Sequence, residues 1–205
     1  MSNTKIEPDT IAPLRDFVVA MTQLVQSTHD ELALLAAARG HLAALLADER
    51  WLPASFAQDR PDSYAQYLLH CDPLQRFSVV SFVWGPGQRT PVHDHTVWGL
   101  VGMLRGAELC EEYDLVDGQP VANGRRHTLR PGQIEAVSPT LGDWHRVSNA
   151  LADRASISIH VYGANIGAVR RHKLDDAGQV ADFVSGYSAA TVPNLWDRSA
   201  AVRGA

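Results

Sequence analysis

Three histidines, carried by two short motifs, are the feature that most constrains how this chain can fold. The first motif is Thr-Pro-Val-His-Asp-His at residues 90–95, and the second is Gly-Asp-Trp-His-Arg-Val at residues 142–147. His93 and His95 are two residues apart, so in a strand their side chains leave from the same face. His145, on a distant strand of a closed barrel, can complete the set. The spacing predicts a β structure in which three imidazoles meet one metal ion.

The alternative is that His93 and His95 form an ordinary surface or hydrogen-bonded pair with no ion between them. Imidazole nitrogen binds iron, copper, zinc and nickel, so the three residues alone do not identify the metal. The position four residues after His95 is Gly99, so no acidic ligand is expected there. A metal held by three neutral ligands would keep positions open for a substrate.

The N-terminal part of the sequence predicts helices. Apolar residues recur there at three- and four-residue spacing, which gives one apolar helix face. Thr28 followed by Glu31 predicts a capping box at the start of a second helix. Pro61 predicts a third, short helix that carries Gln66. We therefore expect a helical layer over about residues 8–72.

The pattern changes near Phe77, where short apolar runs begin to alternate with turn signals such as Gly-Pro-Gly. Many short strands joined by tight turns predict a β-sandwich or a small barrel, at about residues 75–165. Residues 166–205 form a C-terminal extension. The expected strands are 77–84, 97–104, 107–115, 127–129, 134–137, 144–147 and 155–162. Within the extension, 180–184 predicts a short helix and 192–196 is expected to pack on the core.

Composition excludes several classes of function. The chain has 205 residues and a formal net charge of −5, which fits one domain without a basic stripe, so nucleic acid is not an expected partner. The longest apolar stretches are too short to span a bilayer, and no secretory signal is visible. Cys71 and Cys110 form no disulfide framework, which favours a reducing cytoplasm. We expect Cys110 to be a buried packing residue.

The motifs resemble those of the cysteine dioxygenase type I family, thiol dioxygenases with a cupin fold. The resemblance covers about Tyr64 to Arg171, and its third specific segment is Ser-Ile-Ser-Ile-His-Val-Tyr-Gly at 156–163. Gly87 and Gly106 stand where the first cupin motif has tight turns. The resemblance implies a mainly β protein, a cupin jelly-roll β-barrel behind an N-terminal α-helical layer, with residues 1–205 as a single domain.

The same resemblance implies the chemistry of the site. His93, His95 and His145 would bind Fe(II), and the reaction would add both atoms of O2 to a small-molecule thiol, giving a sulfinic acid. No organic cofactor is needed, because the thiol supplies the electrons. Sequence leaves the oligomeric state open.

The third segment has one polar and one apolar face, because Ser158, His160 and Tyr162 alternate with apolar residues. The polar row can point into the barrel, where it must form its own hydrogen bonds, or outwards into solvent. The resemblance implies the inward arrangement. Tyr162 would then act in catalysis, oriented by His160 and Ser158.

Two departures from animal cysteine dioxygenases bear on the substrate. Those enzymes crosslink the active-site tyrosine to a cysteine, but here Gly99 lies near the corresponding place. They also bind the cysteine carboxylate with an arginine, where this chain has Gln66, so a charge-assisted bond is lost. Both departures resemble the bacterial 3-mercaptopropionate dioxygenase branch, in which Arg171 would meet the carboxylate. Its neighbour Arg170 is an alternative, and a solvated surface pair is another.

Other residues carry weaker expectations. Trp98 and Trp144 flank the histidines and could line the pocket or pack in the core. His127 and His172 have no ligand spacing and are assigned to no site. An acidic patch is expected to be solvated surface and comprises Glu108, Glu111 and Glu112. The rival functions are cysteine dioxygenase itself and a non-oxygenase cupin, either an isomerase or a binding module.

Overall fold

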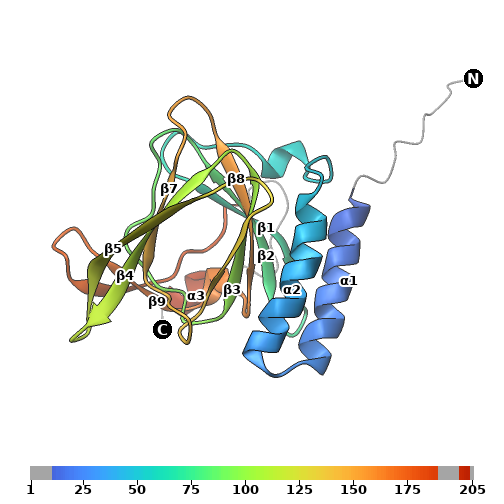
Figure 1. Ribbon diagram of the computed structural model, residues 1–205, viewed down its shortest axis with the longest axis horizontal. Coiled ribbons are helices and arrows are strands. Elements are labelled where there is room, and N and C mark those ends of the chain that lie inside the picture. Colours follow the sequence, from blue (N-terminus) through green and yellow to red (C-terminus); the bar gives the residue numbers. More distant parts are fainter. Residues whose placement is uncertain (1–10, 189–198, 204–205) are drawn as a thin grey trace, which may run out of the picture.

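Two antiparallel sheets face each other, and a pair of helices packs on one side (Figure 1). The structure is a computed structural model that describes residues 11–188 and 199–203. The larger sheet has the strand order β1-β2-β8-β3-β6, and the smaller has the order β5-β4-β7. A separate hairpin, β10-β9, follows the barrel. This arrangement confirms the predicted mainly β jelly-roll barrel with a helical layer.

The elements have the following bounds. The helices are α1 (Ala12–Ser27), α2 (Glu31–Leu46), η1 (Ala54–Phe56), η2 (Ile166–Ala168) and α3 (Ser199–Arg203). The strands are β1 (Ala65–Cys71), β2 (Ser78–Trp84), β3 (Gly99–Arg105), β4 (Glu108–Val116), β5 (Gln119–Leu129), β6 (Ile134–Val137), β7 (His145–Asn149), β8 (Ser156–Tyr162), β9 (Arg171–Leu174) and β10 (Val180–Phe183).

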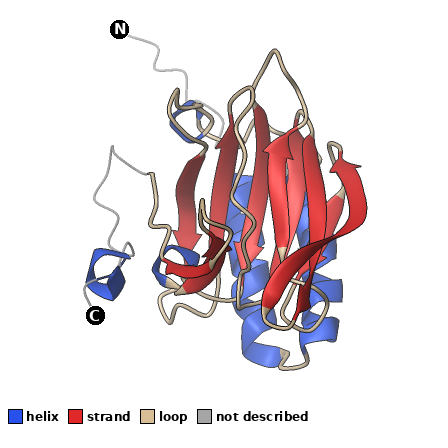
Figure 2. Cartoon of the chain, turned by 90° about the vertical axis from the view of Figure 1, so that its left-hand side faces the viewer, coloured by secondary structure: helices blue, strands red, loops and turns tan. Residues whose placement is uncertain are grey.

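The helical layer covers the outer face of the larger sheet, as Figure 2 shows from the side. Helix α2 packs on β3 at Gly102, where an added Cβ would lie 2.6 Å from Leu46 Cδ1. The cap of α2 differs from the prediction. Thr28 ends α1, and the Asp30 side chain accepts a 2.8 Å hydrogen bond from the backbone N–H of Ala33. Asp30 caps better there because it directly precedes the first turn.

Two predicted helices are strands instead. Residues 65–71 form β1, which pairs with β2 so that Gln66 lies opposite Phe82. The helical layer therefore ends well before residue 72, and Gln66 belongs to the barrel. Residues 180–183 form β10, paired with β9. Both segments are short, and backbone pairing with a neighbouring strand outweighs a weak helical pattern. The packing expected of 192–196 falls outside the described residues.

The predicted turns are present. Gly87 and Gly106 have φ angles of 76° and 81°, in the left-handed region that glycine tolerates best. Gly106 is also tightly enclosed, because an added Cβ would collide with the Ser156 hydroxyl. Within residues 11–188 and 199–203, no helix combines the length and apolar character needed to cross a membrane.

Candidate metal centre

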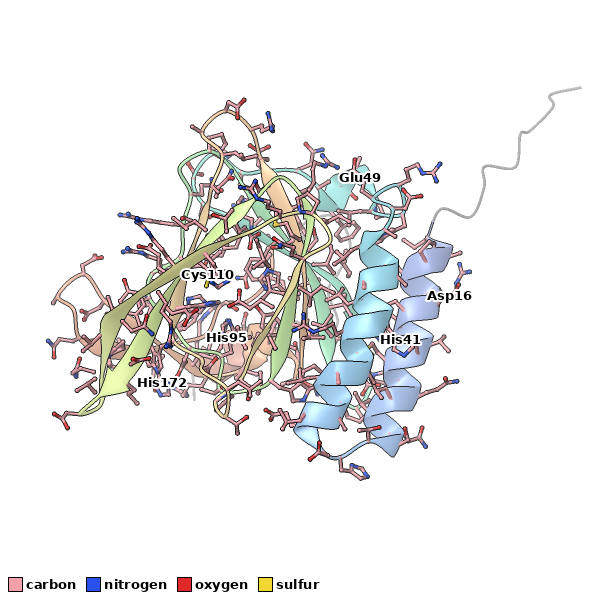
Figure 3. The ribbon with its side chains drawn as sticks, in the orientation of Figure 1. Asp16, His41, Glu49, His95, Cys110 and His172 are labelled. Atoms are coloured by element: carbon pink, nitrogen blue, oxygen red, sulfur yellow. The ribbon has the colours of Figure 1, made fainter. Side chains whose placement is uncertain are left out.

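The three histidines of the sequence motifs meet inside the barrel. His93 lies between β2 and β3, and it pairs with His145 of β7 through two reciprocal backbone hydrogen bonds of 3.0 Å. The candidate ligand atoms of His93, His95 and His145 all lie within 4.8 Å of one another, and all three residues are buried. Figure 3 shows His95 between the two sheets. The prediction that these side chains converge is met by the geometry.

Each of the three rings has its Nδ1 atom beside a protein group. His93 Nδ1 lies 3.2 Å from the carbonyl oxygen of Pro91, and His95 Nδ1 lies 2.7 Å from Asp143 Oδ1. His145 Nδ1 lies 3.5 Å from Cys110 Sγ. Such partners fix the ring orientation and the tautomer of metal-binding histidines, so Nε2 remains for an ion.

Asp143 also holds the turn that carries His95. Its Oδ2 atom accepts hydrogen bonds of 2.9 Å from the backbone N–H groups of His95 and Thr96. Thr96 has a φ of 58°, a left-handed conformation that is uncommon for threonine. One carboxylate therefore positions both the backbone and the ring of His95, a contribution that the sequence motif did not reveal.

The electrostatics favour neutral imidazoles. Burial, followed by the charges of His145 and Arg171, lowers the pKa of His95 well below its usual value. Burial also lowers the pKa of His145 to about 4, against an opposing effect of Asp143. Neutral imidazole is the form that binds metals. Three inward nitrogens without a carboxylate in the cluster fit a divalent transition metal such as Fe(II) with open positions.

The polar row of β8 points into the barrel, as the resemblance implied. Ser158 Oγ lies 2.8 Å from His160 Nε2, and His160 Nδ1 lies 2.7 Å from the Tyr162 hydroxyl. The indole N–H of Trp84 donates to Ser158 Oγ over 3.3 Å. Burial raises the pKa of Tyr162, so its hydroxyl keeps its proton at neutral pH. The row is a continuous chain of hydrogen bonds that ends at Tyr162 beside His95.

Glu108 corrects the prediction of a solvated acidic patch. Its residue is only 2% exposed, because β4 turns it into the barrel beside the β8 row. Burial raises the pKa of Glu108 to about 7, although hydrogen bonds from Ser158 and Trp84 lower it. Its Oε1 atom has no hydrogen-bond partner among the described residues. A titratable carboxyl thus lies at the end of the row remote from Tyr162.

The histidines open onto a cavity of about 400 Å³. Its wall includes both Gln66 and Arg171, so the two predicted substrate-binding residues lie around one space with the candidate ligands. Arg170 points elsewhere and forms an exposed ion pair with Asp182 at 3.2 Å. Position therefore distinguishes Arg171 from its neighbour.

Arg171 is buried, and it forms no ion pair with a carboxylate among the described residues. Its Nη2 donates to Ser185 Oγ over 2.6 Å, and its guanidinium lies 4.6 Å from the centre of the Phe183 ring. The Nε atom has no hydrogen-bond partner within the described residues. Burial lowers the pKa of Arg171 from its usual value, while nearby Tyr162 and Tyr64 raise it.

Several wall residues were not foreseen, and for two tryptophans the structure decides between lining the pocket and packing elsewhere. Trp98 packs with the core under the helices, and Trp144 stacks near His172, so neither lines the cavity. The unforeseen wall residues are Arg60, Tyr64, Phe82, Trp84, Lys173, Phe183, Ser185, Tyr187 and Ser188. Those after residue 175 come from the extension, whose sequence carries no motif.

Comparison with known families identifies this arrangement. The family model for cysteine dioxygenase type I matches residues 1–175. The chain belongs to this family. Membership supports thiol dioxygenase chemistry in general and agrees with a three-histidine metal centre. The last cavity residues, Phe183 to Ser188, lie beyond the matched part.

Solved structures give more distant likenesses. One is an uncharacterised conserved protein with a double-stranded β-helix domain from Klebsiella pneumoniae subsp. pneumoniae, 15% identical, with a TM-score of 0.45 over 66% of this chain and 97% of that chain. Another is a cupin superfamily protein from Desulfitobacterium hafniense, 16% identical, with a TM-score of 0.42 over 57% and 93% of the two chains.

The family's tyrosine–cysteine crosslink has no counterpart at position 99. An added Cβ on Gly99 would lie 2.9 Å from Tyr162 Cδ1, so this residue faces the tyrosine ring directly. The two cysteines of the chain are Cys71 in β1 and Cys110 in β4. The expectation that Gly99 occupies the corresponding place agrees with the geometry.

Proposed function

We propose that the protein is an Fe(II)-dependent dioxygenase of a small mercapto-carboxylic acid, with 3-mercaptopropionate as the first candidate. The observation that carries the choice of substrate class is Arg171, a buried cation on the cavity wall without an ion-pair partner among the described residues. The reaction adds both oxygen atoms of O2 to the thiolate sulfur. Sulfur supplies all four electrons, so no reductant is consumed.

Arg171 would hold the substrate's carboxylate. A buried charge is costly unless an opposite charge meets it, and a carboxylate in the cavity meets that need. The partnerless Nε and the fork of guanidinium donors suit a bidentate contact. Ser185 and Phe183 keep the guanidinium in place. Gln66 adds a neutral polar group from β1, and the other cationic residues of the wall are Arg60 and Lys173.

His93, His95 and His145 would hold Fe(II), which when bound supplies a centre that binds the thiol as thiolate and activates O2. Arg171 and the three histidines line the same cavity. A short acid could therefore reach from the guanidinium to the histidines. 3-Mercaptopropionate has the required thiol and carboxylate, and it lacks the amine that cysteine carries.

Tyr162 would donate a hydrogen bond into the reacting space. Its raised pKa keeps the hydroxyl protonated, and His160 and Ser158 fix its direction. The stacked ring of Phe82, 4.1 Å from His160 between ring centres, helps to exclude water from the row. We expect Tyr162→Phe to lower kcat by about tenfold or more while iron content stays unchanged. Unchanged turnover would remove the row from the mechanism.

The deciding experiment is oxygen consumption by anaerobically iron-loaded protein with four thiols: 3-mercaptopropionate, cysteine, cysteamine and mercaptosuccinate. The expected result is the highest kcat/KM with 3-mercaptopropionate and a sulfinate product that contains both atoms of labelled O2. Cysteamine is the matched control, because it keeps the thiol and lacks the carboxylate. Preference for cysteamine would contradict the role of Arg171.

Two other outcomes would select the rival functions. Fastest uptake with cysteine would make the protein a cysteine dioxygenase and overturn the interpretation of Gln66. Tight binding of zinc or another metal with no oxygen uptake from any thiol would indicate a non-oxygenase cupin.

A further inference from the structure

A second cluster of metal-ligating side chains lies behind the histidine centre. Cys110 of β4, His127 of β5 and Glu135 of β6 offer ligand atoms that all lie within 4.8 Å of one another. Cys110 and His127 are register partners on neighbouring antiparallel strands, so their side chains share one face of the sheet. Glu135 comes from the edge strand of the other sheet. The cluster therefore bridges the seam between the two sheets.

From this cluster we propose a second metal site that takes Zn²⁺, with Cys110, His127 and Glu135 as its protein ligands. Glu135 Oε2 lies 3.0 Å from His127 Nε2, and Glu135 Oε1 lies 3.9 Å from Cys110 Sγ. Ligand atoms of a tetrahedral zinc ion lie about 3.3–3.8 Å apart, given Zn–N and Zn–S bonds of about 2.0–2.3 Å. Small side-chain rotations would bring the three atoms to one ion, with water in the fourth position.

The ring of His127 is already oriented for this role. Glu112 Oε1 lies 3.6 Å from His127 Nδ1, on the side of the ring opposite Glu135. A carboxylate on the second nitrogen is the usual support of a zinc-binding histidine. The cluster is also accessible, because the His127 side chain is 38% exposed and Glu135 borders a separate cavity of about 240 Å³. A metal could enter without crossing the substrate cavity.

The donor set separates this site from the histidine centre. A thiolate, an imidazole and a carboxylate suit zinc, whereas calcium and magnesium prefer oxygen ligands alone. The thiolate of Cys110 and the carboxylate of Glu135 would balance the two charges of the ion. Binding would release the thiol proton to water. His145 Nδ1 lies 3.5 Å from Cys110 Sγ. A ligand of the proposed zinc site would therefore contact a ligand of the histidine centre.

Cobalt distinguishes the sites, because a thiolate ligand to Co²⁺ gives a near-ultraviolet charge-transfer band that imidazole and carboxylate ligands do not. The folded, metal-free protein is titrated with Co²⁺ under anaerobic conditions, and bound metal is measured by equilibrium dialysis. We expect two equivalents of metal and the thiolate band. Cys110→Ser should lose the band and bind one equivalent, at the three-histidine centre.

Cys71→Ser is the matched control, since Cys71 is also buried but belongs to no cluster of ligands among the described residues. It should keep the band and both equivalents. If Cys110→Ser does not fold, His127→Asn tests the same site at a half-exposed residue. This variant should also bind one equivalent of metal. A wild-type protein that binds one equivalent without the band would overturn the proposal. A second equivalent retained by folded Cys110→Ser or His127→Asn would overturn it as well.

Discussion

Arg171 and Glu108 are buried ionisable side chains, and neither forms an ion pair within residues 11–188 and 199–203. They lie on different sides of the β8 row: Arg171 faces the cavity, while Glu108 adjoins Ser158. Because an isolated buried charge is costly, each residue needs a ligand or a proton. Arg171 would obtain an anionic substrate, and Glu108 can take a proton.

The role of Arg171 is tested by Arg171→Gln. Loss of a charge-assisted hydrogen bond of about 1.5–3 kcal/mol should raise KM for 3-mercaptopropionate by roughly 10–100-fold. KM for cysteamine, which has no carboxylate, should change little. Steady-state oxygen uptake measures both. Arg170→Gln is the matched control, because its partner is the exposed Asp182, and equal effects of the two variants would contradict the assignment.

Glu108 makes stability depend on pH. Its pKa rises from an ordinary 4.5 to about 7 in the folded protein, so below pH 4.5 both states are protonated and the folded protein bears no penalty. As pH rises from 4.5 to 7, only the unfolded chain loses the proton, and stability falls by at most about 3 kcal/mol. Glu108→Gln should remove this decline. Chemical denaturation at pH 5 and pH 8 measures the free energy of unfolding of both proteins. The difference between Glu108→Gln and the wild type should favour the variant more at pH 8 than at pH 5. An equal difference at the two pH values would show that Glu108 does not titrate between them.

At the scale of elements, the helical layer and the barrel meet most closely where α2 crosses β3. Gly102 has no side chain, and this lets Leu42 and Leu46 of α2 pack directly on the strand. β3 pairs edge to edge with β8, whose residues His160 and Tyr162 line the cavity. The contact therefore sets the position of a strand that lies beside the polar row of β8.

Two glycine substitutions separate this close packing from ordinary helix propensity. Gly102→Ala should destabilise the protein by about 1–3 kcal/mol, because the added methyl group overfills a packed contact. Gly40 is an exposed position of α2, and an added Cβ there would have no atom within 4 Å. Gly40→Ala should therefore stabilise the protein by about 0.5–1 kcal/mol. Urea denaturation measures both. The same sign for both variants would contradict the packing account.

The sequence predicted the site better where spacing decides geometry than where packing does. His93, His95 and His145 could be placed together because their spacing and the recurring turns match a motif, although His93 and His95 lie between β2 and β3 and not on a strand. Glu108 could not, because the barrel interior is polar here and reverses the usual rule that charged residues face solvent. Gln66 was predicted on a helix, since its short segment fits either periodicity until β2 pairs with it.

At the scale of the whole molecule, part of the cavity wall comes from residues 183–188. The contacts that hold this part of the wall include two from its last residues: Ser188 exchanges hydrogen bonds with the backbone of Gln66, and the Tyr187 hydroxyl accepts from the N–H of Gly167 and donates to Asn165. This part of the wall lies outside the family match. We propose that its residues help to select the substrate.

Tyr187→Phe tests whether this wall matters for binding. Removing a partly buried hydroxyl that bonds Gly167 and Asn165 should cost about 1 kcal/mol locally and loosen residues 183–188. We expect a higher KM for 3-mercaptopropionate, unchanged iron content and faster hydrogen exchange in that segment. Faster exchange with an unchanged KM would show that the wall does not contribute to substrate binding.

Gly99, which lies against the Tyr162 ring, bears on whether the protein changes covalently during its working life. Animal cysteine dioxygenases, which this chain resembles, crosslink the corresponding tyrosine to a cysteine. With Gly99 beside the ring, no such bond can form at that position. A newly synthesised molecule and one that has completed many turnovers would then have the same mass. Crosslinking at this position would not change the turnover rate with time.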